Sequence, residues 1–211
     1  MRALPLILTA LGQAGVLGAI EVLGRWGLRP ELTRRLAYVV GAASVAVLPF
    51  FLTLTELVVL GVFFTGVLAW TWLRHQLDSV HAVQRPTVGA LVFPAGLLAG
   101  AWVGWGHLLA IAFGALVLAL ADPCAAWVGG RSRGPGWRVP GGRKTLAGAA
   151  AFVVTTVGVG VALAGFSPGR LPALVAAALL LAAVEATVGY GLDNLSIPPL
   201  ASLLATTWLG M

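Results

Sequence analysis

The chain has 211 residues, of which 59% are hydrophobic and only 9% are charged. Its mean hydropathy is +0.97. Soluble domains carry about 25% charged residues, so this composition excludes a soluble globular protein, and the single cysteine excludes a disulfide-stapled one. The net charge of +6 comes from 13 basic and 7 acidic residues. We expect a polytopic integral membrane protein with one transmembrane domain over residues 1–211.

Apolar runs of about 17–25 residues fit helices that cross a hydrocarbon core about 30 Å thick. The sequence contains seven such runs: 4–23, 36–52, 54–73, 88–105, 107–128, 145–166 and 171–192. A shorter eighth run, 197–209, is compatible with a span, an interfacial helix or a re-entrant segment. The runs are continuous and lack the strict alternation of barrel strands. The predicted fold class is therefore all-α, with about seven transmembrane helices and a possible short eighth.

Basic residues gather in every second loop of this arrangement. Loops 24–35, 74–87 and 129–144 hold eleven of the thirteen Lys and Arg residues, whereas the opposite side keeps only Arg2 and Arg170. Cytoplasmic loops are enriched in Lys and Arg, so the N-terminus is predicted to lie outside the cell membrane and these loops inside. The same rule explains the positive charge without nucleic acid, which is not an expected partner.

Three of the seven acidic residues are candidates for chemistry: Asp122, Glu185 and Asp193. An ionisable side chain within a span is costly and is a functional candidate by default. Asp122 precedes Pro123, so the fifth helix is expected to break there and to present the carboxylate at the cytoplasmic edge. Glu185 would lie roughly 12 Å before Asp193 on a continuous helix. The alternative for both Asp122 and Glu185 is a carboxylate that is merely paired with a loop arginine.

Loop 129–144, GGRSRGPGWRVPGGRK, contains six glycines, four arginines and one lysine. Glycines let backbone amides approach phosphate oxygens, and arginine and lysine bind them, so the composition favours a polyphosphate site. A positive-inside anchor has similar charge and is the alternative. A Walker loop is excluded because Lys144 follows Arg143 and the segment follows a helix. By contrast, Glu21 and Arg25 are spaced for a structural ion pair on one helix.

Two motifs resemble those of the dolichol kinase and phytol kinase family. The first motif of the family is D-x-x-A-x-x-x-G, and it is similar to Asp122, Ala125 and Gly129 in this chain. It is followed by K-[ST]-x-x-G, which is similar to Lys144, Thr145 and Gly148. Glu185 with 193–198, Asp-Asn-Leu-Ser-Ile-Pro, resembles the second signature, an intramembrane glutamate followed by D-N-x-x-[IV]-P. Where the family has R-K-x-x-H, this chain has Arg34, Arg35 and, in the last position, Tyr38.

The resemblance implies a kinase that uses CTP and a divalent metal such as Mg²⁺ to phosphorylate a lipid alcohol of the phytol, geranylgeraniol, polyprenol or dolichol type. The same broad superfamily contains cytidylyltransferases that make CDP-lipids, and this activity is the alternative. A transporter is a third possibility, but transporters place polar groups near the bilayer midplane, whereas here they cluster at one face.

The chemistry of phosphoryl transfer suggests roles for the matched residues, because it needs metal and cations at the phosphates and an oriented nucleophile. Asp122 and Asp193 are the expected metal ligands, and the expected catalytic residues are these two together with Lys144 and Glu185. The residues expected to bind the nucleotide are Gly129, Arg131, Arg143, Lys144, Thr145, Gly148 and Asn194. The apolar helices would hold the isoprenoid tail, with its hydroxyl at the cytoplasmic surface.

Overall fold

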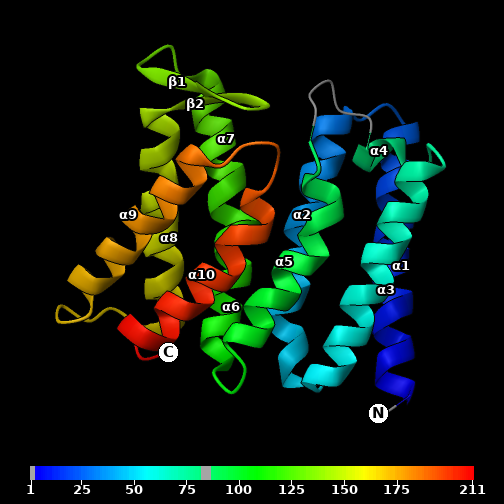
Figure 1. The fold of residues 1–211 in the computed structure, drawn as a ribbon, viewed down its shortest axis with the longest axis horizontal. Coiled ribbons are helices and arrows are strands. Elements are labelled where there is room, and N and C mark those ends of the chain that lie inside the picture. The colour runs from blue at the N-terminus through cyan, green and yellow to red at the C-terminus, as the bar shows by residue number, and fades with distance from the viewer. Residues whose placement is uncertain (1–2, 82–86) are drawn as a thin grey trace.

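In a computed structural model that describes residues 3–81 and 87–211, helices account for most of the chain (Figure 1). The elements in chain order are α1 (Ala3–Arg25), α2 (Pro30–Val47), η1 (Leu48–Phe50), α3 (Leu54–Leu73), α4 (Asp78–His81), α5 (Gly89–Val103), α6 (Leu108–Leu116), η2 (Val117–Ala121), α7 (Asp122–Arg131), β1 (Gly136–Val139), β2 (Gly142–Thr145), α8 (Leu146–Ala164), α9 (Leu171–Thr187) and α10 (Asp193–Trp208). The predicted all-α class is confirmed, with the β1–β2 hairpin as an addition to it.

Among the described residues, five helical segments are long and apolar enough to cross a membrane. These segments are Ala3–Arg25, Pro30–Phe50, Leu54–Leu73, Leu108–Arg131 and Leu146–Ala164. Helices α5 and α9 are apolar but have only 15 and 17 residues. Helix α10 covers the eighth apolar run with 16 residues and contains Pro198 and Pro199. The molecule is therefore a helical membrane protein, and the count of about seven spans stays a prediction.

The basic loops lie together at one end of the bundle. Figure 1 shows the α1–α2 connection, α4 and the β1–β2 hairpin at the end opposite the N- and C-termini, together with the α9–α10 connection. This arrangement agrees with the predicted alternation of loops. Arg2 and Arg85, which were counted in that pattern, lie outside the described residues.

The seventh apolar run does not form one helix to residue 192. Helix α9 ends at Thr187, and α10 begins at Asp193 after a connection with positive φ at Tyr190 (+56°) and Gly191 (+81°). Left-handed backbone cannot continue a right-handed helix, and glycine adopts it most readily. The expectation that Glu185 and Asp193 share one continuous helix, about 12 Å apart, is therefore wrong.

The fifth apolar run contains a wide turn and no break at Asp122. Residues Val117–Ala121 form a π-helical turn, and α7 follows directly with Pro123 in its first turn. Proline lacks the N–H that an α-helical hydrogen bond needs, and a single π turn is a common way to accommodate such a defect within a helix. The expected break at Asp122 is thus wrong, and Leu108–Arg131 runs as one helical segment of 24 residues.

Helix α5 packs closely along α10, and glycines set the distance between them. A β-carbon at Gly96 would overlap the carbonyl oxygen of Asn194, and one at Gly100 would lie 3.0 Å from Pro198. Small residues let transmembrane helices approach closely, which is how they gain dispersion contacts where no hydrophobic driving force exists. This close pair fixes the start of α10, and with it Asp193 and Asn194, beside the start of α5.

Candidate active site

A cavity of about 400 Å³ lies at the end of the bundle that carries the hairpin. Its wall is built by α2, α7, the β1–β2 hairpin, the end of α9 (Leu171–Thr187), the 188–192 connection and the first residues of α5, α8 and α10. The charged side chains that line it are Glu31, Arg34, Arg35, Asp122, Arg143, Lys144, Glu185 and Asp193. The cavity therefore gathers acidic and basic groups from segments that are far apart in sequence.

Three carboxylates meet in this cavity. Among the residues that the structure describes, Asp122, Glu185 and Asp193 can each offer one oxygen such that these atoms all lie within 4.8 Å of one another. Glu185 is 4% exposed, and it comes from the last turns of α9, whereas Asp193 begins α10. The break between the two helices brings the carboxylates together. Glu185 thus joins the two aspartates that the sequence suggested as metal ligands.

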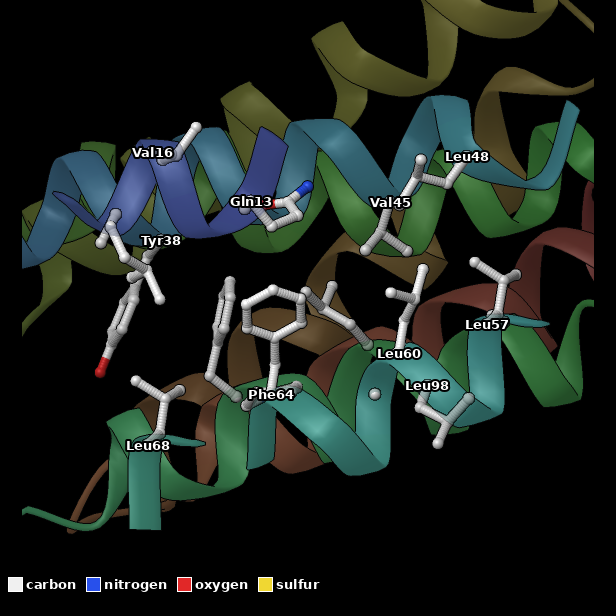
Figure 2. Close-up of a pocket in the computed structure, with 18 of the residues that line it drawn as sticks. Gln13, Val16, Tyr38, Val45, Leu48, Leu57, Leu60, Phe64, Leu68 and Leu98 are labelled. Atoms are coloured by element: carbon white, nitrogen blue, oxygen red, sulfur yellow. The ribbon is translucent and has the colours of Figure 1, made fainter. Parts of the chain in front are cut away.

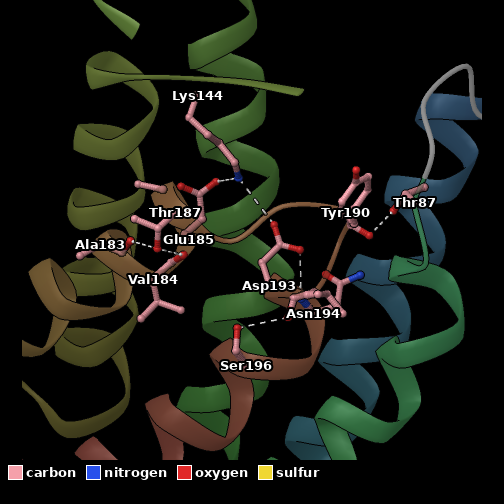
Figure 3. A network of polar contacts seen from close by, with 12 residues as sticks. Thr87, Lys144, Ala183, Val184, Glu185, Thr187, Tyr190, Asp193, Asn194 and Ser196 are labelled. Carbon is pink, nitrogen blue, oxygen red and sulfur yellow. Dashed lines mark hydrogen bonds and ion pairs between the residues drawn. The ribbon is translucent and has the colours of Figure 1, made fainter. Parts of the chain in front are cut away.

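Lys144 inserts its ammonium group between two of these carboxylates (Figure 3). Its Nζ forms an ion pair with Glu185 and lies 3.6 Å from Oδ2 of Asp193. Burial lowers the pKa of Lys144, but the negative charges of Glu185 and Asp193 outweigh this effect and leave the pKa above its usual value of 10.5. The lysine is therefore protonated at neutral pH.

The hairpin holds Lys144 at this position through its turn and its docking contacts. Lys144 on β2 pairs with Trp137 on β1, and the turn is closed by Pro140 and Gly141, whose φ is +82°. Proline followed by a glycine with positive φ is the preferred sequence of a type II turn. The indole N–H of Trp137 donates to the carbonyl of Ala186 at 2.8 Å. The hairpin is thereby fixed to the end of α9, next to Glu185.

Hydrogen bonds attach the 188–192 connection to the hairpin on one side and to the residues before α5 on the other. The backbone N–H of Tyr190 donates to the carbonyl of Pro140 at 2.9 Å. The carbonyl of Tyr190 accepts from the Thr87 hydroxyl at 3.0 Å, which is drawn in Figure 3, and from the N–H of Val88 at 2.9 Å. A β-carbon at Gly189 would overlap the Pro140 carbonyl oxygen. The connection therefore links the hairpin to the segment that leads into α5.

Three helices begin at the cavity wall. Gly89 starts α5, Thr145 is the N-cap of α8, and Asp193 starts α10. All three residues line the cavity. The N-terminus of a helix carries partial positive charge and directs backbone N–H groups outward, so it favours anions. Together with Arg34, this backbone arrangement makes the cavity suited to phosphate groups.

Comparison with known proteins places the chain in a family. Over an alignment of 226 positions that covers 99% of this chain, it is 32% identical to the phytol kinase of Synechocystis sp., of which 96% is covered. The chain belongs to the phytol and polyprenol kinase family. No protein-family model matches the chain, and no solved structure matches it.

Several residues of the family-like motifs have packing roles in this kinase-family chain. Ala125 is buried, and a β-carbon at Gly148 would come 2.9 Å from its carbonyl oxygen. A β-carbon at Gly129 would come 2.9 Å from Oγ1 of Thr145. The same Oγ1 accepts from the backbone N–H of Gly148 at 3.1 Å. Gly129, Thr145 and Gly148 line the cavity, and they also allow α7 and α8 to meet closely beneath it.

The remaining residues that the sequence suggested for nucleotide binding differ in position. Arg143 lines the cavity and donates to the carbonyl of Gly134 at 2.9 Å. Asn194 lines it as well, and its amide donates to the carbonyl of Gly89 at 3.0 Å, which ties α10 to α5. Arg131 does not line the cavity, and its guanidinium stacks on Trp127 with 4.1 Å to the ring centroid. Arg131 is therefore the basic residue predicted to bind the nucleotide that the structure places outside the cavity.

Sequence reasoning named Arg34 and Tyr38 only as the residues that stand where the family has R-K-x-x-H, and it gave them no role in the site. Both line the cavity from α2, with the Arg34 guanidinium carbon 5.6 Å from the Tyr38 ring centroid. We predicted a helix beginning at residue 36 and placed Arg34 in a loop. Helix α2 instead begins at Pro30, and proline is favoured in the first helical turn. Reading the helix from that proline would have placed the two residues one turn apart on the same face.

Proposed function

We propose that this chain is a CTP-dependent kinase that phosphorylates the terminal hydroxyl of an isoprenoid alcohol. The observation that carries the proposal is the cluster of Asp122, Glu185 and Asp193 with Lys144, in a cavity at one end of a bundle of apolar helices. The similarity to a phytol kinase supports the reaction class and an isoprenoid acceptor. CTP as donor is inferred from the motif resemblance.

The charges that line the cavity suit the binding of a nucleoside triphosphate and the transfer of its terminal phosphoryl group. Lys144, Arg143 and Arg34 would face the phosphate oxygens, and the three helix N-termini would add backbone donors. Enzymes accelerate phosphoryl transfer mainly by positioning the reactants and stabilising the charge on the transferred group. A preorganised set of cations and backbone dipoles provides that stabilisation without moving during the reaction.

The proposed reaction is a single displacement at phosphorus. The alcohol oxygen forms a bond to the γ-phosphorus of CTP, the bond from that phosphorus to the β,γ-bridging oxygen breaks, and CDP leaves. The alcohol proton passes to a carboxylate oxygen of the Asp122, Glu185 and Asp193 cluster that does not bind the cation. Lys144 stabilises the negative charge that develops on the leaving phosphate. The products are CDP and a lipid monophosphate.

The three carboxylates fit a hard divalent cation. They form an oxygen-only donor set with a separation that one ion can bridge, and their three negative charges exceed the one positive charge of Lys144. We propose that Asp122, Asp193 and Glu185 hold Mg²⁺, which would neutralise phosphate oxygens of the nucleotide when bound. Asn194, next to Asp193, would hydrogen-bond the nucleotide with its amide.

The identity of the products tests the proposal and separates it from a cytidylyltransferase. Purified protein in lipid vesicles would be incubated with CTP labelled at the α- or the γ-phosphate, Mg²⁺ and one acceptor: geranylgeraniol, phytol or phosphatidate. We expect γ-label in a lipid monophosphate and α-label in CDP. Transfer of α-label to a phosphatidate acceptor with release of pyrophosphate would establish the cytidylyltransferase instead. Absence of label from every lipid, with each nucleoside triphosphate tried, would overturn the proposal.

A further inference from the structure

A second cavity lies between α1, α2, α3 and α5, and its wall is almost entirely apolar (Figure 2). Helix α3 contributes Leu57, Leu60, Phe64 and Leu68, which Figure 2 shows along one side of the space. Gln13 of α1 adds an amide to this wall. The wall of this cavity suits an apolar ligand, and Tyr38 is the residue that it shares with the polar cavity.

Tyr38 is shared by the two cavities. It lines the apolar cavity and also the polar one. Its ring stacks on Phe93 with 4.7 Å between centroids and 12° between planes. In Figure 2 the hydroxyl of Tyr38 lies at one end of the space. Tyr38 therefore marks the boundary between an apolar compartment and the compartment that holds the carboxylates.

At this boundary two buried polar atoms lack partners. The hydroxyl oxygen of Tyr38 and Nε of Arg34 are buried and have no hydrogen-bond partner among the residues that the structure describes. Arg34 is 5% exposed, and it lines the polar cavity one helical turn before Tyr38. Leaving a buried donor or acceptor unpaired costs free energy, and most such groups in native proteins are paired. The pair indicates that a polar ligand group completes this site.

We propose that the apolar cavity, of about 120 Å³, binds the part of the isoprenoid chain next to the alcohol, and that the Tyr38 hydroxyl hydrogen-bonds the terminal alcohol oxygen. This inference rests on the proposed function and identifies the acceptor site for it. An isoprenoid alcohol is apolar along its chain and polar at one end, which matches an apolar cavity closed by one phenol. After transfer, Arg34 faces the new phosphate group of the product from the polar side.

The first test removes the Tyr38 hydroxyl alone. Tyr38→Phe keeps the ring that stacks on Phe93, so the helix packing is retained. We expect the KM for geranylgeraniol to rise about tenfold, with the KM for CTP unchanged. A lipid-alcohol KM equal to that of the wild type would overturn the role of Tyr38, whereas a wild-type protein without any lipid phosphorylation would overturn the proposed function.

The second test introduces a larger side chain from α3 into the apolar cavity and measures lipid binding by photolabelling, which does not require catalysis. A photoreactive isoprenoid alcohol with a diazirine in its chain should label peptides of Leu54–Leu73, and excess phytol should reduce the labelling. Gly61 lines the cavity, and a β-carbon there would lie 3.1 Å from Cδ2 of Leu98 on α5, so a leucine side chain would crowd this wall. Gly61→Leu should therefore lower labelling and kcat/KM for geranylgeraniol about tenfold. Gly66→Leu is the matched control, because Gly66 is exposed on the same helix and a β-carbon there meets no atom within 4 Å.

The outcomes of this second test separate the two proposals. Cavity labelling that Gly61→Leu abolishes and Gly66→Leu retains would support the acceptor site even if the phosphoryl donor were wrongly assigned. Labelling confined to other helices, or equal labelling in wild type and Gly61→Leu, would overturn the acceptor site.

Discussion

The ammonium group of Lys144 is stabilised by carboxylates that the fold places around it. It contacts Glu185 directly and Asp193 at 3.6 Å. We expect Lys144→Ala to lower kcat by a factor that corresponds to about 2–4 kcal/mol, the range for other preorganised charge-stabilising contacts. Lys144→Arg should lose less, because it keeps the charge. A steady-state assay of lipid phosphate formation measures both, and full activity in Lys144→Ala would contradict the assignment.

The raised pKa of Lys144 predicts how the activity depends on pH. The charged form is favoured in the folded protein, so its contribution is fully present below the ordinary pKa of 10.5 and is lost only as the pH rises through the higher folded-state value. Lysine deprotonation should therefore cause no fall in kcat up to about pH 9. The pH profile of the wild type measures this. A fall near neutral pH that Lys144→Arg shifts upward would contradict it.

The contribution of Glu185 to the proposed metal binding can be tested by substitution. Its carboxylate lies within 4.8 Å of those of Asp122 and Asp193, so Glu185→Gln removes one negative charge from the set and weakens the attraction for a cation. We expect the Mg²⁺ concentration for half-maximal activity to rise about tenfold or more. Titration of activity with Mg²⁺ is the measurement. An unchanged Mg²⁺ requirement would limit Glu185 to orienting Lys144.

At the scale of elements, the hairpin is the device that presents Lys144 to the carboxylates. Gly189→Ala places a β-carbon against the Pro140 carbonyl and should displace the hairpin from the α9–α10 connection. We expect kcat to fall about tenfold or more, with a loss of about 1–3 kcal/mol in stability. Gly169→Ala, at an exposed position where a β-carbon meets nothing within 4 Å, is the control. Wild-type kinetics in Gly189→Ala would show that the hairpin contact is dispensable.

The apolar spans were predictable from sequence because hydropathy and length determine them. The third run, 54–73, coincides with α3, and the first, 4–23, differs from α1 by one or two residues at each end. The α9–α10 break was missed because Gly189 and Gly191 sit in an apolar stretch, where their backbone conformation depends on contacts with Pro140 and Gly89. Long-range contacts of this kind leave no local signal.

The residues of the site were predictable from sequence, but the contacts between them were not. Asp122, Glu185 and Asp193 could be singled out as rare acidic residues near apolar runs, and Lys144 through the glycine-rich loop and its motif. The structure brings all four into one cavity. The contact between Lys144 and Glu185 spans 41 residues. It depends on a hairpin in loop 129–144, for which the sequence predicted a polyphosphate site and no strands. The packing roles of Gly129 and Gly148 likewise depend on how α7 meets α8.

At the scale of the whole molecule, the proposed function assigns the two cavities to different substrates, the apolar one to the lipid and the polar one to the nucleotide. The apolar cavity lies among α1, α2, α3 and α5, and the carboxylates are held by α7, α9 and α10 with Lys144 from the hairpin. Figure 1 shows the hairpin at the end of the bundle away from both termini. Such an arrangement lets a lipid acceptor stay in the bilayer while its hydroxyl meets a donor from the water phase.

The orientation of this arrangement in the membrane is a separate prediction. We expect the hairpin end to face the cytoplasm, because the basic loops gather there. In a Cys124→Ser background, a membrane-impermeant thiol reagent should label Arg133→Cys only from the cytoplasmic side, and Gly169→Cys, at the connection between α8 and α9, only from outside. Labelling of Arg133→Cys from outside would contradict this prediction and show the opposite orientation.

The central claim is that the carboxylate cluster supports phosphoryl transfer from nucleotide to lipid. The most direct measurement is the transfer of γ-label from CTP to geranylgeraniol, made side by side for the wild type, Asp122→Asn, Asp193→Asn and Glu21→Gln in lipid vesicles. Asparagine keeps the shape of aspartate and loses the charge that holds a cation, so both Asp variants should lose most transfer while inserting normally. Glu21, which pairs with Arg25 at 3.3 Å on α1, serves as the control and should retain wild-type transfer. Well-folded Asp122→Asn and Asp193→Asn proteins with wild-type transfer would contradict the account.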